Sequence, residues 1–260
     1  MLTATIIQSA LFWEDKLANL LQFEQKINAV SGKTNLVVLP EMFSTGFSMR
    51  AKDLAETMDG PTVTWMKKMA IDHTIIVTGS VIIKENQQYF NRLIWMLPNG
   101  SFGYYDKRHL FAFAGEDKHY TAGTKRLITS VNGFKIQLLV CYDLRFPVWT
   151  RQADQVNPEY DILIVVANWP ATRSNAWKTL LAARAIENQC YVIGVNRVGE
   201  DGNKNYHSGD STIIDPLGNI LFTQADEPVV HTIALHKETL NEIRSKFPFG
   251  KDADAFHIIQ

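Results

Sequence analysis

Three residues with reactive side chains lie at or near the ends of predicted strands. Glu41 directly follows the apolar segment LVVLP, and Cys141 directly follows the apolar segment KIQLLV. Lys107 lies in YYDKRHLF, just beyond a predicted hairpin turn at Asn99-Gly100. Because ligands of α/β sheets bind at the carboxyl ends of strands, a carboxylate, an amine and a thiol can converge at one rim. Together they suit chemistry in which a nucleophile, a proton carrier and a cation act on one substrate.

Each of these residues alone also has an ordinary structural explanation. A Cys at the end of a core strand is most often a small buried apolar side chain. A Glu after a strand is usually solvated or caps a helix, and a Lys in a polar loop usually lies at the surface. The second cysteine, Cys190, lies inside an apolar strand with no acid or base close in sequence, and we expect it to pack in the core. Cys141 is therefore the thiol that needs a chemical explanation.

The elements that must position these groups alternate between β-rich runs and helical patterns. Nine strands are predicted, at 4–8, 36–40, 74–83, 89–97, 135–143, 161–168, 190–198, 211–222 and 229–235. Four helices are predicted, at 14–30, 61–71, 174–188 and 236–246. The early β-α-β order favours parallel pairing and the turn signals favour hairpins, so mixed sheets are expected. Nine strands are too many for one flat sheet, which predicts two sheets packed face to face with helices outside.

Composition limits the class of protein and its partners. The 260 residues include 26 Lys and Arg and 27 Asp and Glu, a net charge of −1, and 46% are hydrophobic. These values exclude gross disorder and argue against nucleic acid or an anionic membrane as the main partner. No signal peptide or membrane-spanning run is recognisable, and two cysteines are too few for a disulfide scaffold. We expect a single cytoplasmic domain over 1–260 with free thiols.

Motifs for metals and nucleotide cofactors are missing from the sequence. Neither H-E-x-x-H nor C-x-x-C spacing occurs, so no metal site is expected. Neither a G-x-x-x-x-G-K-[ST] loop nor a G-x-G-x-x-G fingerprint occurs, so no cofactor is expected.

The segments around the three reactive residues resemble a known family. LPEMFSTGF (39–47), YDKRHLF (105–111) and CYDLRFP (141–147) are similar to the three signature segments of the nitrilase superfamily, the carbon–nitrogen hydrolases. The resemblance extends over nearly the whole chain. It implies an α/β fold, a four-layer α-β-β-α sandwich of two mixed β-sheets, which agrees with the two-sheet prediction. It also implies a catalytic triad in which Glu41 is the general base, Cys141 the nucleophile and Lys107 the partner of the tetrahedral intermediate.

Hydrolysis of an amide by this triad would pass through a thioester. The carboxylate would accept the thiol proton, deliver it to the departing ammonia and then activate water. The backbone N–H of Tyr142 is the expected second donor to the oxyanion. Glu116 is a candidate for the second glutamate that many family members place beside the triad, with a surface carboxylate as the alternative. Asp143 and Arg145 are expected to form a structural pair after the nucleophile.

Within the superfamily the chain looks most similar to the ω-amidase branch. That resemblance implies hydrolysis of the terminal amide of small 2-oxo dicarboxylic monoamides, α-ketoglutaramate and α-ketosuccinamate, to the 2-oxo acid and ammonia. The partners would be this small amide and water, and a homodimer is expected. Arg173 is the candidate for binding the remote carboxylate, although it could instead border the following helix. Phe43, Trp169 and Tyr142 are candidates for the pocket walls, with ordinary packing as the alternative.

Three other functions stay open from the sequence. The first is a different C–N hydrolase, a nitrilase or an N-carbamoyl amide hydrolase. Release of ammonia from an amide, without carbon dioxide, would distinguish an ω-amidase from these enzymes. A redox thiol module would keep its function in Glu41→Gln and would respond mainly to oxidation of Cys141. A non-catalytic nitrilase-like scaffold is disfavoured because all three triad positions are filled.

Overall fold

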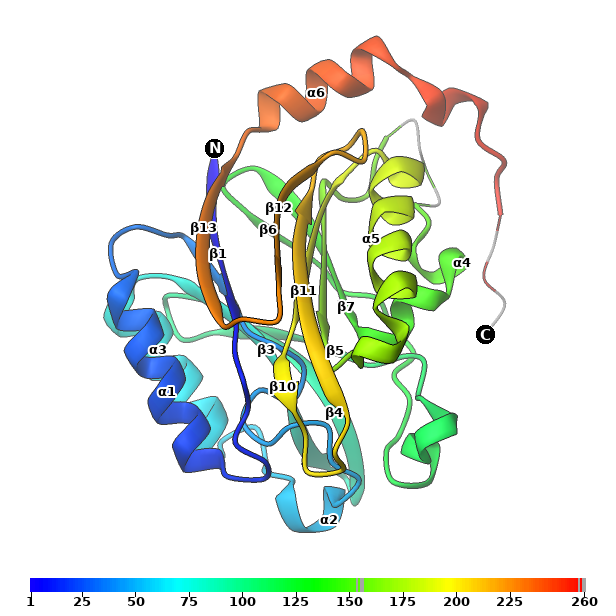
Figure 1. Cartoon of the computed structure of the whole chain (residues 1–260). Helices are drawn as coiled ribbons and strands as arrows, with labels where there is room; N and C mark the ends of the chain where they lie inside the picture. The colour runs from blue at the N-terminus through cyan, green and yellow to red at the C-terminus, as the bar shows by residue number, and fades with distance from the viewer. Residues whose placement is uncertain (153, 155–156, 257, 259–260) are drawn as a thin grey trace.

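Two mixed β-sheets pack face to face in the computed structural model, which describes residues 1–152, 154, 157–256 and 258 (Figure 1). The first sheet has, in spatial order, β13 (Val229–Leu235), β1 (Leu2–Gln8), β2 (Leu36–Val38), β3 (Ile76–Glu85), β4 (Gln88–Met96) and β5 (Phe102–Asp106). Its three central strands, β1, β2 and β3, are parallel, and the outer pairings are antiparallel.

The second sheet repeats this plan of a parallel centre with antiparallel additions. Its strands, in spatial order, are β10 (Val198–Glu200), β11 (Tyr206–Ile214), β9 (Tyr191–Asn196), β8 (Ile162–Ala167), β7 (Phe134–Val140) and β6 (Ile128–Val131), while β12 (Ile220–Ala225) also pairs with β11. Strands β7, β8 and β9 are parallel. In each sheet the carboxyl ends of the parallel strands lie at the same edge, where the residues that follow them can meet.

Alternation along the strands separates the two sides of the first sheet. Ile6 and Val38 belong to the core between the sheets, whereas Ile7 and Val37 belong to a second core beneath helices α1 (Lys16–Ala29) and α3 (Pro61–His73). This period of two is what a strand buried on both faces requires. Helix α5 (Ser174–Asn188) covers the second sheet, so the fold has the expected four layers.

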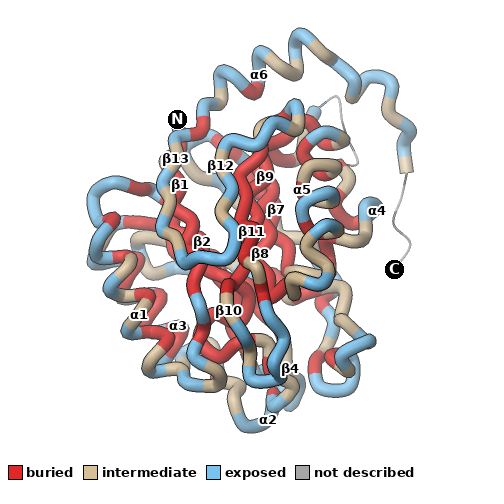
Figure 2. Tube along the Cα trace, in the orientation of Figure 1, coloured by how far each residue is buried: buried red, intermediate tan, exposed pale blue. Residues whose placement is uncertain are grey.

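The remaining helical segments lie around this sandwich. They are α2 (Ala51–Leu54), α4 (Pro147–Thr150), α6 (Lys237–Lys246) and five short 3₁₀ turns: Ala112–Ala114, Glu116–Lys118, Cys141–Arg145, Ala171–Arg173 and Phe249–Asp252. Burial is concentrated in the central strands of the two sheets, whereas β12, β13 and α6 are largely exposed or intermediate (Figure 2). Within the described part of the chain, every helix is too short or too polar to cross a membrane.

The predicted strands and helices are found, with informative differences at the ends. The strand predicted over 135–143 ends at Val140, because Cys141 has a left-handed φ of 46° and begins a 3₁₀ turn. The run 190–198 is divided into β9 and β10, and the run 211–222 is divided into β11 and β12. Strands β5 and β6 were not predicted. Both are edge strands with part of their length exposed, so they lack a long apolar run.

Candidate active site

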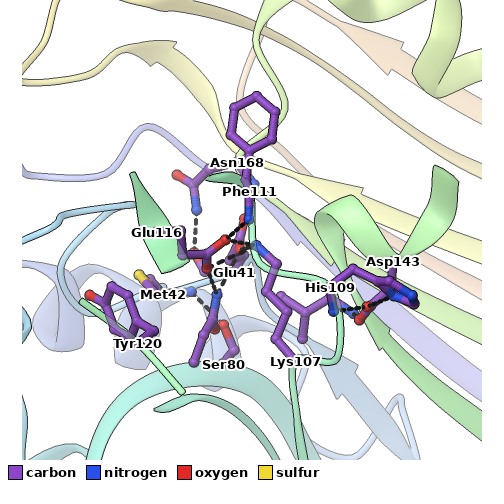
Figure 3. A network of polar contacts seen from close by, with 12 residues as sticks. Glu41, Met42, Ser80, Lys107, His109, Phe111, Glu116, Tyr120, Asp143 and Asn168 are labelled. Carbon is purple, nitrogen blue, oxygen red and sulfur yellow. Dashed lines mark hydrogen bonds and ion pairs between the residues drawn. The ribbon is translucent and has the colours of Figure 1, made fainter. Parts of the chain in front are cut away.

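Glu41 lies three residues beyond the end of β2 and is fully buried. Its Oε1 accepts hydrogen bonds from Asn91 Nδ2 at 2.8 Å and from Lys107 Nζ at 3.0 Å. Its Oε2 accepts the backbone N–H of Asn168 at 2.7 Å (Figure 3). Asn168 also donates its side-chain amide to the backbone carbonyl of Glu41 at 2.6 Å. Residues from both sheets therefore hold the carboxylate in one orientation.

Lys107 directly follows β5 and is also buried. Its Nζ donates to Glu41 Oε1 at 3.0 Å and to the two oxygens of Glu116 at 3.0 and 2.9 Å. Burial by itself would lower the pKa of the ammonium, but the charges of Glu116 and Glu41 outweigh burial and raise its pKa. Lys107 therefore stays positively charged in the resting site.

Glu116 comes from the 3₁₀ turn Glu116–Lys118 and has no exposed surface. Besides Lys107, it accepts the backbone N–H of Phe111 at 2.6 Å. Burial raises the pKa of its carboxyl group, while the nearby Lys107 acts in the opposite direction. The predicted alternative, a surface carboxylate, is wrong, because Glu116 is fully buried and forms an ion pair with Lys107.

Cys141 follows the last residue of β7 and lines a cavity of about 380 Å³. Burial raises the pKa of its thiol well above the ordinary value; the Glu41 charge adds to this rise and the Lys107 charge opposes it. The two carboxylates and one ammonium already leave one negative charge beside the thiol. A thiolate would add a second negative charge in a desolvated place, so the resting residue is a neutral thiol.

The cavity is lined by the segments that follow β2, β5, β7 and β8, by the loop between β10 and β11, and by one residue of β11. Its lining residues are Phe47, Met49, Lys107, Phe111, Phe113, Ala114, Cys141, Tyr142, Arg145, Asn168, Trp169, Pro170, Arg173, Asp201, Asn203, Asn205 and His207. Tyr142, Trp169 and Arg173 therefore lie where the sequence prediction placed them.

Phe43 is not a wall of this cavity, and that prediction is wrong. The side chain is fully buried in the core under α1 and α3, with its ring centroid 5.6 Å from Phe23 and 5.8 Å from Trp65. Met42 has a left-handed φ of 42°, so the chain turns between Glu41 and Phe43. The carboxylate enters the site while the ring packs in the core.

Two guanidinium groups line the cavity. Arg145 lies 4.8 Å over the ring of Trp169, and Arg173 lies 5.2 Å over the ring of Phe111. Within the described residues neither arginine forms an ion pair with a carboxylate. The expected pair of Asp143 with Arg145 is wrong. The cavity thus offers two unneutralised cations to an anionic ligand.

Sequence reasoning missed two of the groups that hold the site together, Asn91 and Asn168. Asn168 follows a buried strand, the same signal that identified Glu41 and Cys141. Asn91 is a buried polar residue inside the apolar run of β4. The hydrophobic pattern of that run does not show which group its side chain would contact. Cys190 is fully buried in the core as predicted.

Among the residues that the structure describes, no three His, Cys, Asp or Glu side chains are grouped to hold a metal ion.

Comparison with known proteins finds that the chain is similar to enzymes. The family model described as carbon-nitrogen hydrolase matches residues 3–244. The chain is 43% identical to omega-amidase YafV of Escherichia coli over 99% of this chain and 98% of that protein. It is 32% identical to 2-oxoglutaramate amidase of Bacillus subtilis over 96% of both chains.

A solved structure resembles the fold over its whole length. XC1258 from Xanthomonas campestris, a CN-hydrolase superfamily protein with an arsenic adduct in the active site, is 43% identical, with a TM-score of 0.97. The similarity covers 99% of each chain. The same sandwich is therefore present in an experimentally determined relative.

Proposed function

The chain belongs to the carbon–nitrogen hydrolase family, and we propose that it is an ω-amidase acting through Glu41, Lys107 and Cys141. Its reaction is hydrolysis of the terminal amide of a small 2-oxo dicarboxylic monoamide, such as α-ketoglutaramate or α-ketosuccinamate, to the 2-oxo acid and ammonia. The observation that carries this assignment is the meeting of the three side chains beside a cavity that also holds two unneutralised guanidinium groups. No cofactor is invoked, and residues 1–260 are proposed to act as one domain.

The first half-reaction forms a thioester and releases ammonia. The sulfur of Cys141 attacks the amide carbon while Glu41 accepts the thiol proton, so the nucleophile is generated only as the carbon–sulfur bond forms. Negative charge moves to the carbonyl oxygen, where the Lys107 ammonium and the Tyr142 backbone N–H stabilise it. The intermediate then collapses, the carbon–nitrogen bond breaks, and Glu41 gives the proton to the leaving nitrogen.

The second half-reaction restores the enzyme. Glu41 removes a proton from a water molecule, whose oxygen attacks the thioester carbon. The same two donors stabilise the second oxyanion. The carbon–sulfur bond breaks, the acid product leaves, and the proton returns to the sulfur of Cys141. Glu116 keeps Lys107 in place throughout, because it is the second carboxylate that contacts the ammonium.

The remote carboxylate of the substrate is bound by the guanidinium groups on the cavity wall. Arg173 is the predicted group, and Arg145 lines the same cavity and is equally free of carboxylate partners within the described residues. A planar guanidinium can donate two parallel hydrogen bonds to a carboxylate. This charge explains why an acidic monoamide would be preferred over a neutral amide.

The test is a substrate panel with ammonia and carbon dioxide measured separately. α-Ketoglutaramate, glutamine, asparagine, a nitrile and an N-carbamoyl amino acid are compared for the wild type and Cys141→Ala. We expect ammonia from α-ketoglutaramate with the wild type and a loss of more than about 10³-fold in the folded variant. Activity on another panel member without activity on α-ketoglutaramate would overturn the substrate assignment. Turnover by the variant would overturn the mechanism.

The cytoplasmic location stays a prediction from the sequence, and the homodimer stays a prediction from the family resemblance. Their tests are cell fractionation and the molar mass of the purified protein in solution.

A further inference from the structure

One buried carboxylate connects two segments of the chain: the 3₁₀ turn Cys141–Arg145, here called the nucleophile turn, and the residues around Lys107. Asp143 is fully buried two residues after Cys141. Its Oδ2 accepts the backbone N–H of Val140 at 3.0 Å and the hydroxyl of Tyr105 at 2.8 Å. Its Oδ1 accepts the backbone N–H of His109 at 2.9 Å and contacts Nδ1 of the same residue at 2.8 Å (Figure 3). Because an ionised carboxylate only accepts, Nδ1 carries the proton in this pair.

The partners of this carboxylate lie directly beside the catalytic residues in sequence. Tyr105 and His109 are placed symmetrically, two residues before and two residues after Lys107. Val140 immediately precedes Cys141. The Asp143 side chain therefore holds the residues on either side of Lys107 and the residue just before Cys141. These two segments follow strands of different sheets.

The turn needs such support because its backbone is strained. Cys141 has a left-handed φ of 46°, a conformation that is unfavourable for a non-glycine residue and persists only where the surroundings impose it. The bond from the Val140 N–H to Asp143 closes the turn around Cys141. The same turn sets the direction of the Tyr142 N–H, which must point at the same oxygen as Lys107 during the reaction.

The partners are themselves held in place. The His109 ring stacks on Phe146, with centroids 3.8 Å apart and planes 7° apart. Trp149 donates its Nε1–H to the Tyr105 hydroxyl at 3.0 Å. The carboxylate is thus attached to groups with little freedom to move, which makes it a rigid connection.

We propose that Asp143, with His109 as its partner, is a positioning residue for the amidase reaction. It sets the nucleophile turn at the separation from Lys107 at which both oxyanion donors reach one carbonyl oxygen. It contacts neither the substrate nor the reacting atoms, and the proposal rests on the proposed function. A misplacement of about 1 Å can cost about 10²-fold in rate, so loss of the connection should lower kcat.

Replacement of the carboxylate by an amide tests the connection. In Asp143→Asn one oxygen becomes an NH₂ group, which cannot accept a hydrogen bond. Either orientation of the amide leaves one backbone N–H, that of Val140 or that of His109, facing a donor. We expect kcat to fall between about tenfold and about a hundredfold while KM changes by less than about twofold.

The histidine offers a second test with its own rescue. His109→Ala removes the side-chain contact to Asp143, and we expect a loss of kcat. His109→Asn retains a donor near the position of Nδ1, and we expect it to recover most of that loss. Recovery by a conservative substitution is not expected if the residue only fills space. This pair also decides the question if Asp143→Asn fails to fold.

Asp161 provides a matched control elsewhere in the second sheet. It is also a buried carboxylate that accepts a backbone N–H, from Lys135 at 2.8 Å, and it pairs with Lys237 and Arg244. It precedes β8, at the opposite end of that strand from Asn168. Asp161→Asn should lower thermal stability comparably and leave kcat within about twofold of the wild type.

The outcomes separate this proposal from the proposed function. Ammonia release by the wild type tests the function, whereas the ratio of variant to wild type, measured on any amide that the wild type hydrolyses, tests the connection. An unchanged kcat in folded Asp143→Asn or in His109→Ala would overturn the positioning role. So would an equal kcat loss in Asp161→Asn, because the effect would then follow stability alone.

Discussion

The ammonium of Lys107 lies 3.0 Å from Oε1 of Glu41, and both side chains are almost completely withdrawn from solvent. The second carboxylate, Glu116, contacts the same ammonium at 2.9 Å. With two negative charges and one positive charge, the cluster leaves one carboxylate unneutralised next to the thiol of Cys141. Before substrate binds, the site therefore contains a carboxylate that can accept a proton and a neutral Cys141 thiol, and not a preformed thiolate.

Glu41→Gln should abolish most of the activity without unfolding the protein. The amide keeps the size of the side chain but cannot accept the thiol proton, and we expect kcat to fall by about 10²–10⁴-fold. Initial rates of ammonia release measure this loss. A redox thiol module would keep its function in this variant.

Glu56→Gln is the matched control for that substitution. Glu56 is also mostly buried and accepts a backbone N–H, that of Thr62 at 2.8 Å, whereas Glu41 forms an ion pair with Lys107. Its variant should retain kcat. Equal losses in the two variants would point to a general effect of removing a buried charge, and would contradict the role of Glu41 as the base.

Removal of the negative charge of Glu116 should lower the pKa of the Cys141 thiol. The Glu116 charge is one of the groups that raise this pKa, after burial and the charge of Glu41. In Glu116→Gln the thiolate therefore forms at lower pH. Inactivation by iodoacetamide, followed against pH, should have a midpoint below that of the wild type.

Asp117→Asn removes the same charge one residue away, where the side chain is exposed. Solvent screens this position, so its midpoint should match the wild type. A midpoint in Glu116→Gln that is unchanged or raised would contradict the arrangement of charges around the thiol.

The sequence predicted the parts of the site that follow directly from strands. Glu41 and Cys141 both come just after apolar runs, and parallel strands bring such ends together. Asn168 has the same position after a strand, but the sequence prediction did not name it. The two-sheet architecture followed from the number of strands and the hairpin signals. These features depend on periodicity, which a single sequence displays.

Side-chain directions in irregular segments could not be predicted in the same way. Phe43 lies two residues from Glu41 yet packs in a different core, because the left-handed backbone at Met42 interrupts any alternation. Similarly, Asp143 was expected to pair with Arg145 nearby in sequence. It bonds instead to groups from a distant segment, a choice made by tertiary packing alone.

Burial of His207 should make stability depend on pH between about 4 and the ordinary histidine range. Burial, followed by the charge of Arg197, lowers the pKa of His207 to about 4. The unfolded chain binds a proton near pH 6.5, where the folded protein does not, so acid favours unfolding. The free energy of unfolding should fall by up to about 3 kcal/mol as the pH drops through this window.

Denaturant titrations of the wild type and His207→Asn measure this contribution. The variant cannot titrate at this position, so the difference in stability between the two proteins should shrink as the pH is lowered from about 7 to about 4. A constant difference over this range would mean that His207 titrates alike in both states.

Arg173→Met should weaken binding of the acidic substrate specifically. The guanidinium is replaced by an apolar side chain that keeps part of its packing on Phe111. A charge-assisted hydrogen bond contributes about 1.5–3 kcal/mol, so we expect KM for α-ketoglutaramate to rise by about 10- to 100-fold. Pentanamide, a neutral amide of the same chain length, should lose little. Arg145→Met is measured in parallel, since both guanidinium groups line the cavity.

The control for these arginines is Phe43→Leu, which changes the neighbouring core and not the cavity wall. It should lower the melting temperature because a buried ring is lost, and it should leave the ratio of kcat/KM for α-ketoglutaramate over pentanamide unchanged. Loss of this preference in an arginine variant, with its retention in Phe43→Leu, assigns the preference to charge in the cavity. If both arginine variants keep the wild-type ratio, the carboxylate is bound by other groups and the assignment of these two residues is wrong.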